Sequence, residues 1–191
     1  ALSIAYIIFN RPRHTRETFE VIRAQRPAKL FIIADGPRSG HPTDAERCKA
    51  VRKIVEDIDW PCEVHRDYAE QNLGLKRRIS SGLTWVFSLT ETAIVLEDDC
   101  LPHPDFFGFC QNLLERYKDD ERVWVITGNN FQNGKKRGDA SYYFSKFGHC
   151  WGWASWRRAW QHFDGDLTFW PEWKGSADWL RKMPDPFEQA Y

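Results

Sequence analysis

The sequence has no excess of charge of either sign and no long hydrophobic run. Its 27 Lys and Arg residues balance its 27 Asp and Glu residues. This balance argues against a general nucleic-acid-binding protein, which would show a basic excess. No apolar run approaches the roughly 20 residues that a transmembrane helix needs. We therefore expect no nucleic-acid partner and no transmembrane segment in this chain.

Paired cysteine motifs are missing as well. The five cysteines include no Cys-x-x-Cys pair, so we expect neither a disulfide framework nor a zinc site, and we expect a reducing compartment. No signal peptide is visible, and we predict a cytoplasmic location, with peripheral attachment to the inner face of a membrane as the alternative. The chain opens in a predicted strand and stops without a closing element, so we expect it to be truncated at the C-terminus.

The most informative stretch is an apolar run that ends in three consecutive carboxylates, Glu97, Asp98 and Asp99. Residues 94–96 before them are typical of a strand that is buried on both faces of a parallel sheet. Open α/β sheets bind ligands at the carboxyl ends of their strands. Three adjacent negative charges favour a bound cation, and oxygen ligands favour Mn²⁺ or Mg²⁺. We predict that this triplet binds such a cation; the alternative is a solvated acidic turn.

Strands and helices are predicted to alternate through residues 1–128. This alternation predicts an α/β fold with a mixed, mostly parallel sheet flanked by helices. Thr15 is the predicted cap of the first helix, and Thr43 with Glu46 forms a predicted capping box for the second. The aromatic-rich residues 129–191 are predicted to form a second lobe of the same domain. The predicted strands are 3–9, 30–34, 62–65, 94–96 and 123–126, and the predicted helices are 15–24, 43–58, 75–87 and 105–117.

An aromatic cluster, Trp151-Gly152-Trp153, distinguishes the second lobe. We predict that it follows an aromatic strand at 142–147 and precedes a helix that Ser155 caps. At such a junction a ring can stack on a sugar, and the glycine allows close approach. We predict that one of the two tryptophans borders the ligand cleft; the alternative is that they form the lobe's core. The tryptophans predicted to share one helix face and pack inward are Trp156 and Trp160.

Two further features are expected at the same edge of the sheet. Asp35 follows the second predicted strand, where its carboxylate can bind a ligand or can simply form a turn. Lys76, Arg77 and Arg78 begin a helix directly after Gly74. A helix amino terminus with a nearby arginine is an anion site. The alternative for these basic residues is a solvated helix face.

Five motifs together resemble nucleotide-diphospho-sugar glycosyltransferases of the GT-A fold. The chain resembles the bacterial family 2-like enzymes of the haemolytic-protein-like group, and it resembles the N-acetylglucosaminyltransferase type one enzymes more distantly. The resemblance implies one GT-A-like domain over residues 1–191, with a nucleotide-sugar-binding half at 1–128 and an acceptor-side lobe at 129–191. The motifs, in chain order, are residues 9–12, 33–37, 72–74, 96–99 and 147–153.

In this family the acidic triplet is the DXD element, and the resemblance implies roles for its members. Asp99 would contact the metal, and the two carboxylates before it would contact the ribose or the donor sugar. Asn10 and Arg11 would lie near base and ribose, Asp35 near the uracil edge, and Arg77 near base or phosphates. The full set that we predict near the nucleotide or the sugar is Asn10, Arg11, Asp35, Asn72, Gly74, Arg77, Glu97, Asp98, Trp151, Gly152 and Trp153.

The implied function is metal-dependent transfer of a sugar from a nucleotide diphosphate, above all a UDP-sugar, to a hydroxyl of a carbohydrate or glycoconjugate, with inversion. The family's general base lies in a carboxylate motif of the second lobe. Asp178 beside Trp179 matches that motif poorly, and Asp164 and Asp166 are the other candidates. One alternative is a sugar-1-phosphate nucleotidyltransferase, although no Gly-rich loop follows the first strand. The other is a non-catalytic nucleotide- or carbohydrate-binding domain.

Overall fold

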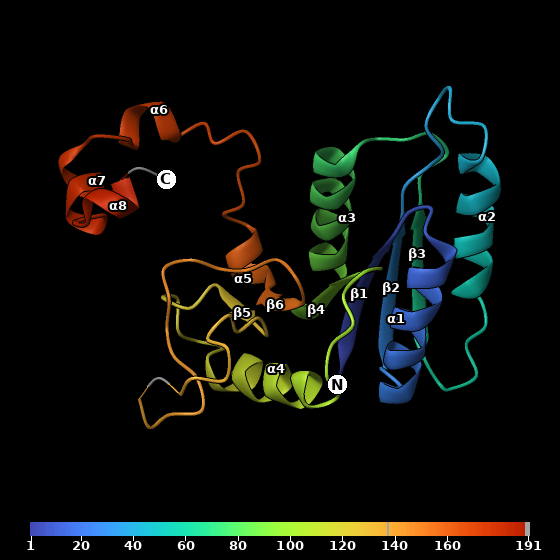
Figure 1. The fold of residues 1–191 in the computed structure, drawn as a ribbon, viewed down its shortest axis with the longest axis horizontal. Helices are drawn as coiled ribbons and strands as arrows, with labels where there is room; N and C mark the ends of the chain where they lie inside the picture. Colours follow the sequence, from blue (N-terminus) through green and yellow to red (C-terminus); the bar gives the residue numbers. More distant parts are fainter. Residues whose placement is uncertain (137, 190–191) are drawn as a thin grey trace. The chain divides into compact units, whose positions relative to one another are not determined.

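The computed structural model describes residues 1–136 and 138–189, and the chain forms two compact units, 1–161 and 162–191. The first unit contains a six-stranded sheet with helices on both faces (Figure 1). The elements of the described residues are β1 (Ser3–Ile8), α1 (Pro12–Gln25), β2 (Lys29–Ala34), α2 (Asp44–Ile54), β3 (Glu63–Tyr68), α3 (Leu75–Leu89), β4 (Thr92–Glu97), α4 (Asp105–Arg116), β5 (Val125–Thr127), β6 (Trp153–Trp156), α5 (Arg157–Trp160), α6 (Trp170–Trp173), α7 (Ala177–Lys182) and α8 (Pro186–Gln189).

The strand order of the sheet is β3-β2-β1-β4-β6-β5. The first four strands run parallel, and β6 pairs antiparallel with both β4 and β5. The inner strands β1, β2 and β4 are almost continuous apolar runs. Their burial on both faces is what parallel strands between helix layers require. The predicted mixed, mostly parallel sheet flanked by helices is therefore confirmed.

Two hydrophobic cores cover the two faces of this sheet. Helices α1, α2 and α4 pack on one face through residues such as Phe19, Val51 and Phe107. Helix α3 packs on the other face through Phe87, and Trp160 of α5 joins that core. Successive side chains of a strand point to opposite faces, so β1 and β4 contribute to both cores.

Two helix starts differ from the predicted ones. Helix α1 begins at Pro12, because proline suits a first helical position, where no amide hydrogen bond is needed. The predicted cap Thr15 is instead a buried residue within that helix. Thr43 does precede α2, but its side chain makes no cap hydrogen bond, so the capping box with Glu46 is wrong. The buried polar residue at this helix start is Asp44.

The aromatic segment also folds differently from the prediction. Residues 142–147 form no strand. The strand of this segment is β6, which extends the sheet with residues that lie well beyond 128. Ser155 is therefore a strand residue, and its hydroxyl donates to the backbone oxygen of Trp124 at 2.7 Å instead of capping a helix.

The predicted shared helix face of Trp156 and Trp160 is wrong for the same reason. Trp156 ends β6 in the core beneath α4, and its Nε1 donates to the oxygen of Leu114 at 3.0 Å. Trp160 ends α5 and stacks on Phe87 and Trp153 on the opposite face of the sheet. A short apolar run fits a helix or a strand equally well, and pairing with β4 decides between them.

The unit formed by residues 162–191 contains three short helices within its described residues. The rings of Trp170 and Trp173 pack with centroids 5.9 Å apart. Ser176 caps α7 by accepting a hydrogen bond from the amide of Trp179 at 3.2 Å. Across the described ranges of both units, every helix is too short or too polar to cross a lipid bilayer.

Candidate functional site

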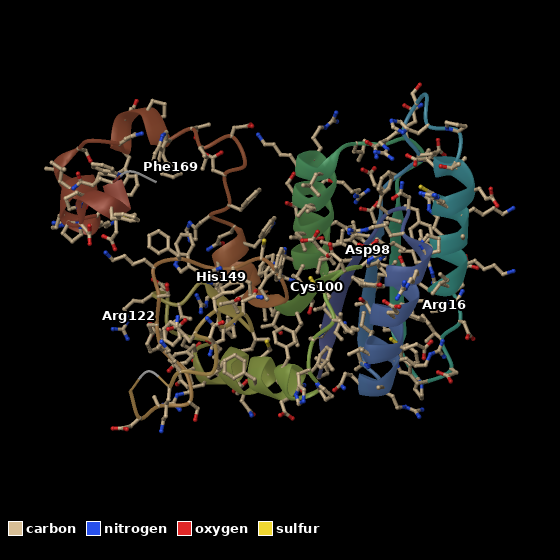
Figure 2. All side chains as sticks on the ribbon, viewed as in Figure 1. Arg16, Asp98, Cys100, Arg122, His149 and Phe169 are labelled. Atoms are coloured by element: carbon tan, nitrogen blue, oxygen red, sulfur yellow. The ribbon has the colours of Figure 1, made fainter. Side chains whose placement is uncertain are left out.

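The three carboxylates Glu97, Asp98 and Asp99 lie where the chain leaves β4, and Figure 2 labels the middle one. Strand β4 pairs with β1 from Ile94 to Glu97, so the triplet lies beside the carboxyl end of β1. Thr18 of α1 holds the turn, because its hydroxyl donates to the backbone oxygen of Asp98 at 2.9 Å. The predicted position of the triplet at the carboxyl edge of the sheet is confirmed.

The two aspartates differ in exposure. Asp98 is 2% exposed, whereas the side chain of Asp99 is 42% exposed. Arg11, the residue before α1, contacts both: its guanidinium pairs with the Asp98 carboxylate, and its Nη1 donates to Asp99 Oδ2 at 3.0 Å. Burial raises the pKa of Asp98, and the Arg11 guanidinium opposes that rise. Arg11 is thus the counter-charge of a buried carboxylate, a role that the sequence did not reveal.

Crowding and burial both act on Glu97, the first member of the triplet. Burial raises the pKa of Glu97, and the charges of Asp99 and Asp98 raise it further. Within residues 1–136 and 138–189, no group of three His, Cys, Asp or Glu side chains could hold a metal ion. Mg²⁺ usually takes one or two carboxylates and completes its shell with water and substrate phosphates. The residues present therefore fit an ion that Asp99 shares with a diphosphate, and they do not fit a closed protein site.

Asp35 joins two loops at the same edge of the sheet. Its buried carboxylate accepts hydrogen bonds from the amides of Gly36 and Leu73, both at 2.8 Å, and from Asn72 Nδ2 at 3.0 Å. The loops press closely together, since a Cβ on Gly36 would lie 2.5 Å from the backbone of Gln71. A carboxylate offers about four lone-pair positions, and these contacts occupy three of them. The predicted contact with uracil stays a prediction.

Helix α3 begins at this edge, and its basic residues have different surroundings. Gly74 precedes it with a φ of 78°, a conformation that favours glycine. Arg77 is exposed, and it makes no ion pair within the described residues. Arg78 is buried and paired with Asp67 of β3, in a part of that strand that the sequence did not predict. Only the exposed arginine of this pair is free to meet a ligand.

Asn10 is tied to the start of α2. Its Nδ2 donates to Asp44 Oδ1 at 2.8 Å, and Arg38 Nε donates to Asp44 Oδ2 at 2.7 Å. These hydrogen bonds, those of Arg38 above all, keep the pKa of Asp44 far below that of an ordinary aspartate. Asp44 is not among the residues predicted from the sequence, although an acidic residue in the first turn of a helix is a recognisable signal. The predicted contact of Asn10 with base or ribose stays a prediction.

A cavity of about 440 Å³ opens beside Asp99. Its wall includes Cys100 from the turn after β4, Phe106 of α4, and the consecutive residues Trp151 and Gly152. Trp151 is 65% exposed, so its indole surface is available to a ligand. The segment before β6 therefore contributes one aromatic ring to the cavity that contains the exposed carboxylate.

Gly152 and Trp153 have other surroundings. Gly152 has a φ of 75°, and a Cβ there would lie 3.5 Å from the ring of Phe106, so the close approach at this glycine is to the protein's own side chain. Trp153 is a β6 residue that packs against the core beneath α3 and stacks on Trp160. It is not part of the cavity wall. Of the two tryptophans, Trp151 is the one that borders the cavity with Asp99.

The three candidate general bases lie in the unit of residues 162–191. Asp164 accepts hydrogen bonds from the amide and hydroxyl of Thr168, which lower its pKa. Asp178 accepts one from Trp173 Nε1 at 2.9 Å, which lowers its pKa too. The remaining candidate, Asp166, donates its amide to Asp164. A lowered pKa weakens a general base, and no base is assigned by this geometry.

Comparisons with known proteins support the fold. No protein-family model and no curated protein matches the sequence. Among solved structures, 4-diphosphocytidyl-2C-methyl-D-erythritol synthase from Anaerococcus prevotii is similar, with a TM-score of 0.50 and 12% identity, over 82% of this chain and 72% of that one. At this identity the likeness concerns the fold alone. The chain therefore shares the mixed α/β fold of that structure.

Two further solved structures have lower TM-scores. A mannosyltransferase from Pyrobaculum calidifontis, in complex with GDP-Man and Mn²⁺, has a TM-score of 0.46 and 16% identity, over 65% of this chain. This chain spans only 34% of the mannosyltransferase. A proposed nucleotide-diphospho-sugar transferase from Desulfovibrio desulfuricans has a TM-score of 0.44 and 14% identity, over 95% of this chain and 75% of that one.

Proposed function

We propose that the first unit binds a nucleotide-diphospho-sugar, above all a UDP-sugar, through a divalent cation at Asp99, and serves in transfer of the sugar to an acceptor hydroxyl. The observation that carries this proposal is the contrast within the triplet. Its buried member, Asp98, is neutralised by Arg11, while Asp99 is exposed beside a cavity of about 440 Å³. The buried Asp98 needs a counter-charge in any acidic turn, so the feature that favours a ligand role is the exposed Asp99 beside the cavity.

Each residue of the edge has a distinct task in this proposal. Asp99 would hold Mn²⁺ or Mg²⁺, which as a Lewis acid stabilises a leaving diphosphate when bound. Glu97, half-buried next to it, accepts a hydrogen bond from a ribose or sugar hydroxyl. Arg77, exposed in the first turn of α3, adds a positive charge toward the diphosphate at a helix amino terminus.

The base of the nucleotide is recognised by the loops that Asp35 joins. The lone-pair position left on its carboxylate accepts the N3–H of uracil. Asn72 and the amide of Leu73 hold that carboxylate in place, so the acceptor is oriented before the ligand arrives. Inversion by in-line attack is the stereochemical outcome that the resemblance favours for this edge.

Isothermal titration of the chain with UDP tests the proposal. Wild type binds UDP in Mn²⁺ and binds it much more weakly when the metal is removed by a chelator. Asp99→Asn keeps the side-chain shape without the charge, so it weakens UDP binding in Mn²⁺ by about ten- to hundredfold. The matched control is Asp119→Asn, at an exposed aspartate in the loop after α4, and it leaves affinity unchanged. Equal affinities of wild type and Asp99→Asn at saturating Mn²⁺ contradict the proposal.

A nucleotidyltransferase reaction is the second enzyme class with a similar fold. The connection from β1 to α1 runs through Phe9, Asn10 and Arg11 to Pro12 and contains no glycine. It therefore lacks the Gly-rich phosphate loop that those enzymes have after their first strand. Release of pyrophosphate from UTP with a sugar-1-phosphate would support this second class and count against sugar transfer.

A further inference from the structure

The guanidinium of Arg11 spans both aspartates of the acidic triplet. Its Nε donates to Asp98 Oδ2 at 3.3 Å, and its Nη2 pairs with Asp98 Oδ1. Its Nη1 donates to Asp99 Oδ2 at 3.0 Å. A guanidinium is a rigid planar fork, so all of these contacts can form at the same time. Two of its three nitrogens therefore face the buried carboxylate, and the third faces the carboxylate that the proposed function assigns to a divalent cation.

The backbone is fixed on both sides of this contact. The carbonyl oxygen of Arg11 accepts the amide of Thr15 at 2.9 Å, at the start of α1. The turn that contains the two aspartates is closed by the amide of Cys100, which donates to the oxygen of Glu97 at 3.0 Å. Thr18 of α1 also donates to the oxygen of Cys100 at 3.2 Å. Because helix and turn are joined in this way, any change in the contact falls on the side chains.

The two halves of the contact differ in how easily they can change. Asp98 is buried, so a loss of Arg11 would leave a buried charge without a partner, which is strongly unfavourable. The side chain of Asp99 is partly exposed and lines the cavity, and an ion pair in such a position contributes little stability. The bond between Arg11 and Asp99 is therefore the one that a second cation can replace.

We propose that Arg11 competes with the divalent cation for Asp99 and so makes binding of the ion depend on the nucleotide. This inference rests on the proposed function. The ion takes Asp99 Oδ2 from Arg11 Nη1, while Nε and Nη2 stay on Asp98. Two positive groups then lie close together, and their repulsion weakens binding of the ion alone. A diphosphate brings negative oxygens that offset this repulsion, so the ion binds more tightly with the nucleotide than without it.

Mn²⁺ titrations of the chain without nucleotide test the inference, with free Mn²⁺ measured by its electron paramagnetic resonance signal. The main variant is Arg11→Met with Asp98→Asn. It removes one positive and one negative charge together, so the net charge of the site is unchanged and no buried charge is left unpaired. We expect this double variant to bind Mn²⁺ about two- to fivefold more tightly than wild type, because Asp99 has lost its competing partner. Damage to the fold would weaken binding instead.

Three further variants control this result. Arg13→Met with Glu17→Gln removes an exposed ion pair of 2.9 Å from the same helix, with the same balance of charge, and leaves Mn²⁺ affinity unchanged. Asp99→Asn added to the double variant abolishes the gain, because the gain acts through that carboxylate. Arg11→Lys keeps a positive charge beside Asp98 but replaces the fork with a single ammonium, so it gains affinity by a smaller factor. This third variant provides the test if thermal unfolding shows that the double variant is not folded.

The outcomes separate this inference from the proposed function. Wild type that binds UDP only with Mn²⁺, with no gain of Mn²⁺ affinity in the double variant or in Arg11→Lys, overturns the role of Arg11 and leaves the proposed function standing. An equal gain in the Arg13 and Glu17 control also overturns it. The expected gain in a chain that binds no UDP supports the competition and overturns the proposed function. Absence of Mn²⁺ binding in wild type and all variants, with and without UDP, overturns both.

Discussion

The cavity beside Asp99 shares the Phe106 ring with a second cavity of about 430 Å³, and the walls of the two cavities are held in different ways. Around Asp99, the side chains follow the ends of parallel strands, and each buried charge has a partner, as Asp98 has in Arg11. The aromatic cavity is lined by α4, β5 and a segment without regular structure, and its rings are held by one another. Charged groups are thus positioned by the backbone of the sheet, and neutral rings by packing.

The largest expected effect concerns two neighbouring arginines in the first turn of α3. Arg78→Ala leaves the partly buried Asp67 unpaired and lowers the free energy of unfolding by about 3 kcal/mol. Arg77→Ala leaves that free energy unchanged, because the side chain is exposed, and weakens UDP binding by about 1–3 kcal/mol. Urea denaturation and UDP titration of both variants measure the two effects. An unchanged UDP affinity in Arg77→Ala would mean that Arg77 is a solvated residue of the helix face and has no role in binding.

The wall between the cavities provides the next test. Phe106→Ala removes a buried ring that lines both cavities, and it lowers the free energy of unfolding by about 3 kcal/mol. Phe131→Ala, at an exposed ring outside both cavity walls, changes it by less than about 0.5 kcal/mol. Urea denaturation compares the two variants. Similar losses in both would mean that Phe106 is not a packed wall between the two cavities.

The two tryptophans on either side of Gly152 differ in their surroundings, because Trp151 is exposed and Trp153 packs against the core. Trp153→Ala removes a ring from the core beneath α3 and lowers the free energy of unfolding by about 2 kcal/mol. Trp151→Ala keeps the stability and weakens binding of a sugar nucleotide, because its exposed ring lines the cavity with Asp99. Denaturation and titration with UDP-glucose separate the two. A loss of stability in Trp151→Ala with no change in binding would assign this ring to the core.

The smallest expected effect is a pH dependence of the free energy of unfolding, caused by Asp44 at the start of α2. Hydrogen bonds from Arg38 lower the folded-state pKa of Asp44 below its ordinary value of 3.8. The stabilisation is therefore present above pH 3.8 and is lost as pH falls toward the folded-state pKa. Asp44→Asn should be less stable than wild type at pH 7, and the difference should shrink below pH 4, as measured by urea denaturation across pH. A difference that does not change with pH would exclude this linkage.

Much of the carboxyl edge of the sheet, where Asp35 and Glu97 lie, could be predicted from local sequence. The run before Glu97 is apolar on every residue, which identifies an inner strand of a parallel sheet and places the next residues at its carboxyl end. The same reasoning placed Asp35 at the end of β2. It could not show that Asn72 and Leu73 bind that carboxylate, because these residues lie 37 and 38 positions further along the chain.

The structure of the aromatic residues in and after β6 was decided by tertiary contacts. Residues 153–156 alternate between the two faces of the sheet only because β6 pairs antiparallel with β4, almost 60 residues earlier in the chain. Without that partner, the short aromatic run fits a helix as well as a strand, so Trp156 and Trp160 were predicted on one helix face. The sequence by itself determined the parallel sheet and the acidic edge, because burial on both faces leaves an unmistakable apolar run. Only the tertiary structure determined which carboxylate is exposed and which rings line a cavity, because both depend on contacts between residues far apart in the sequence.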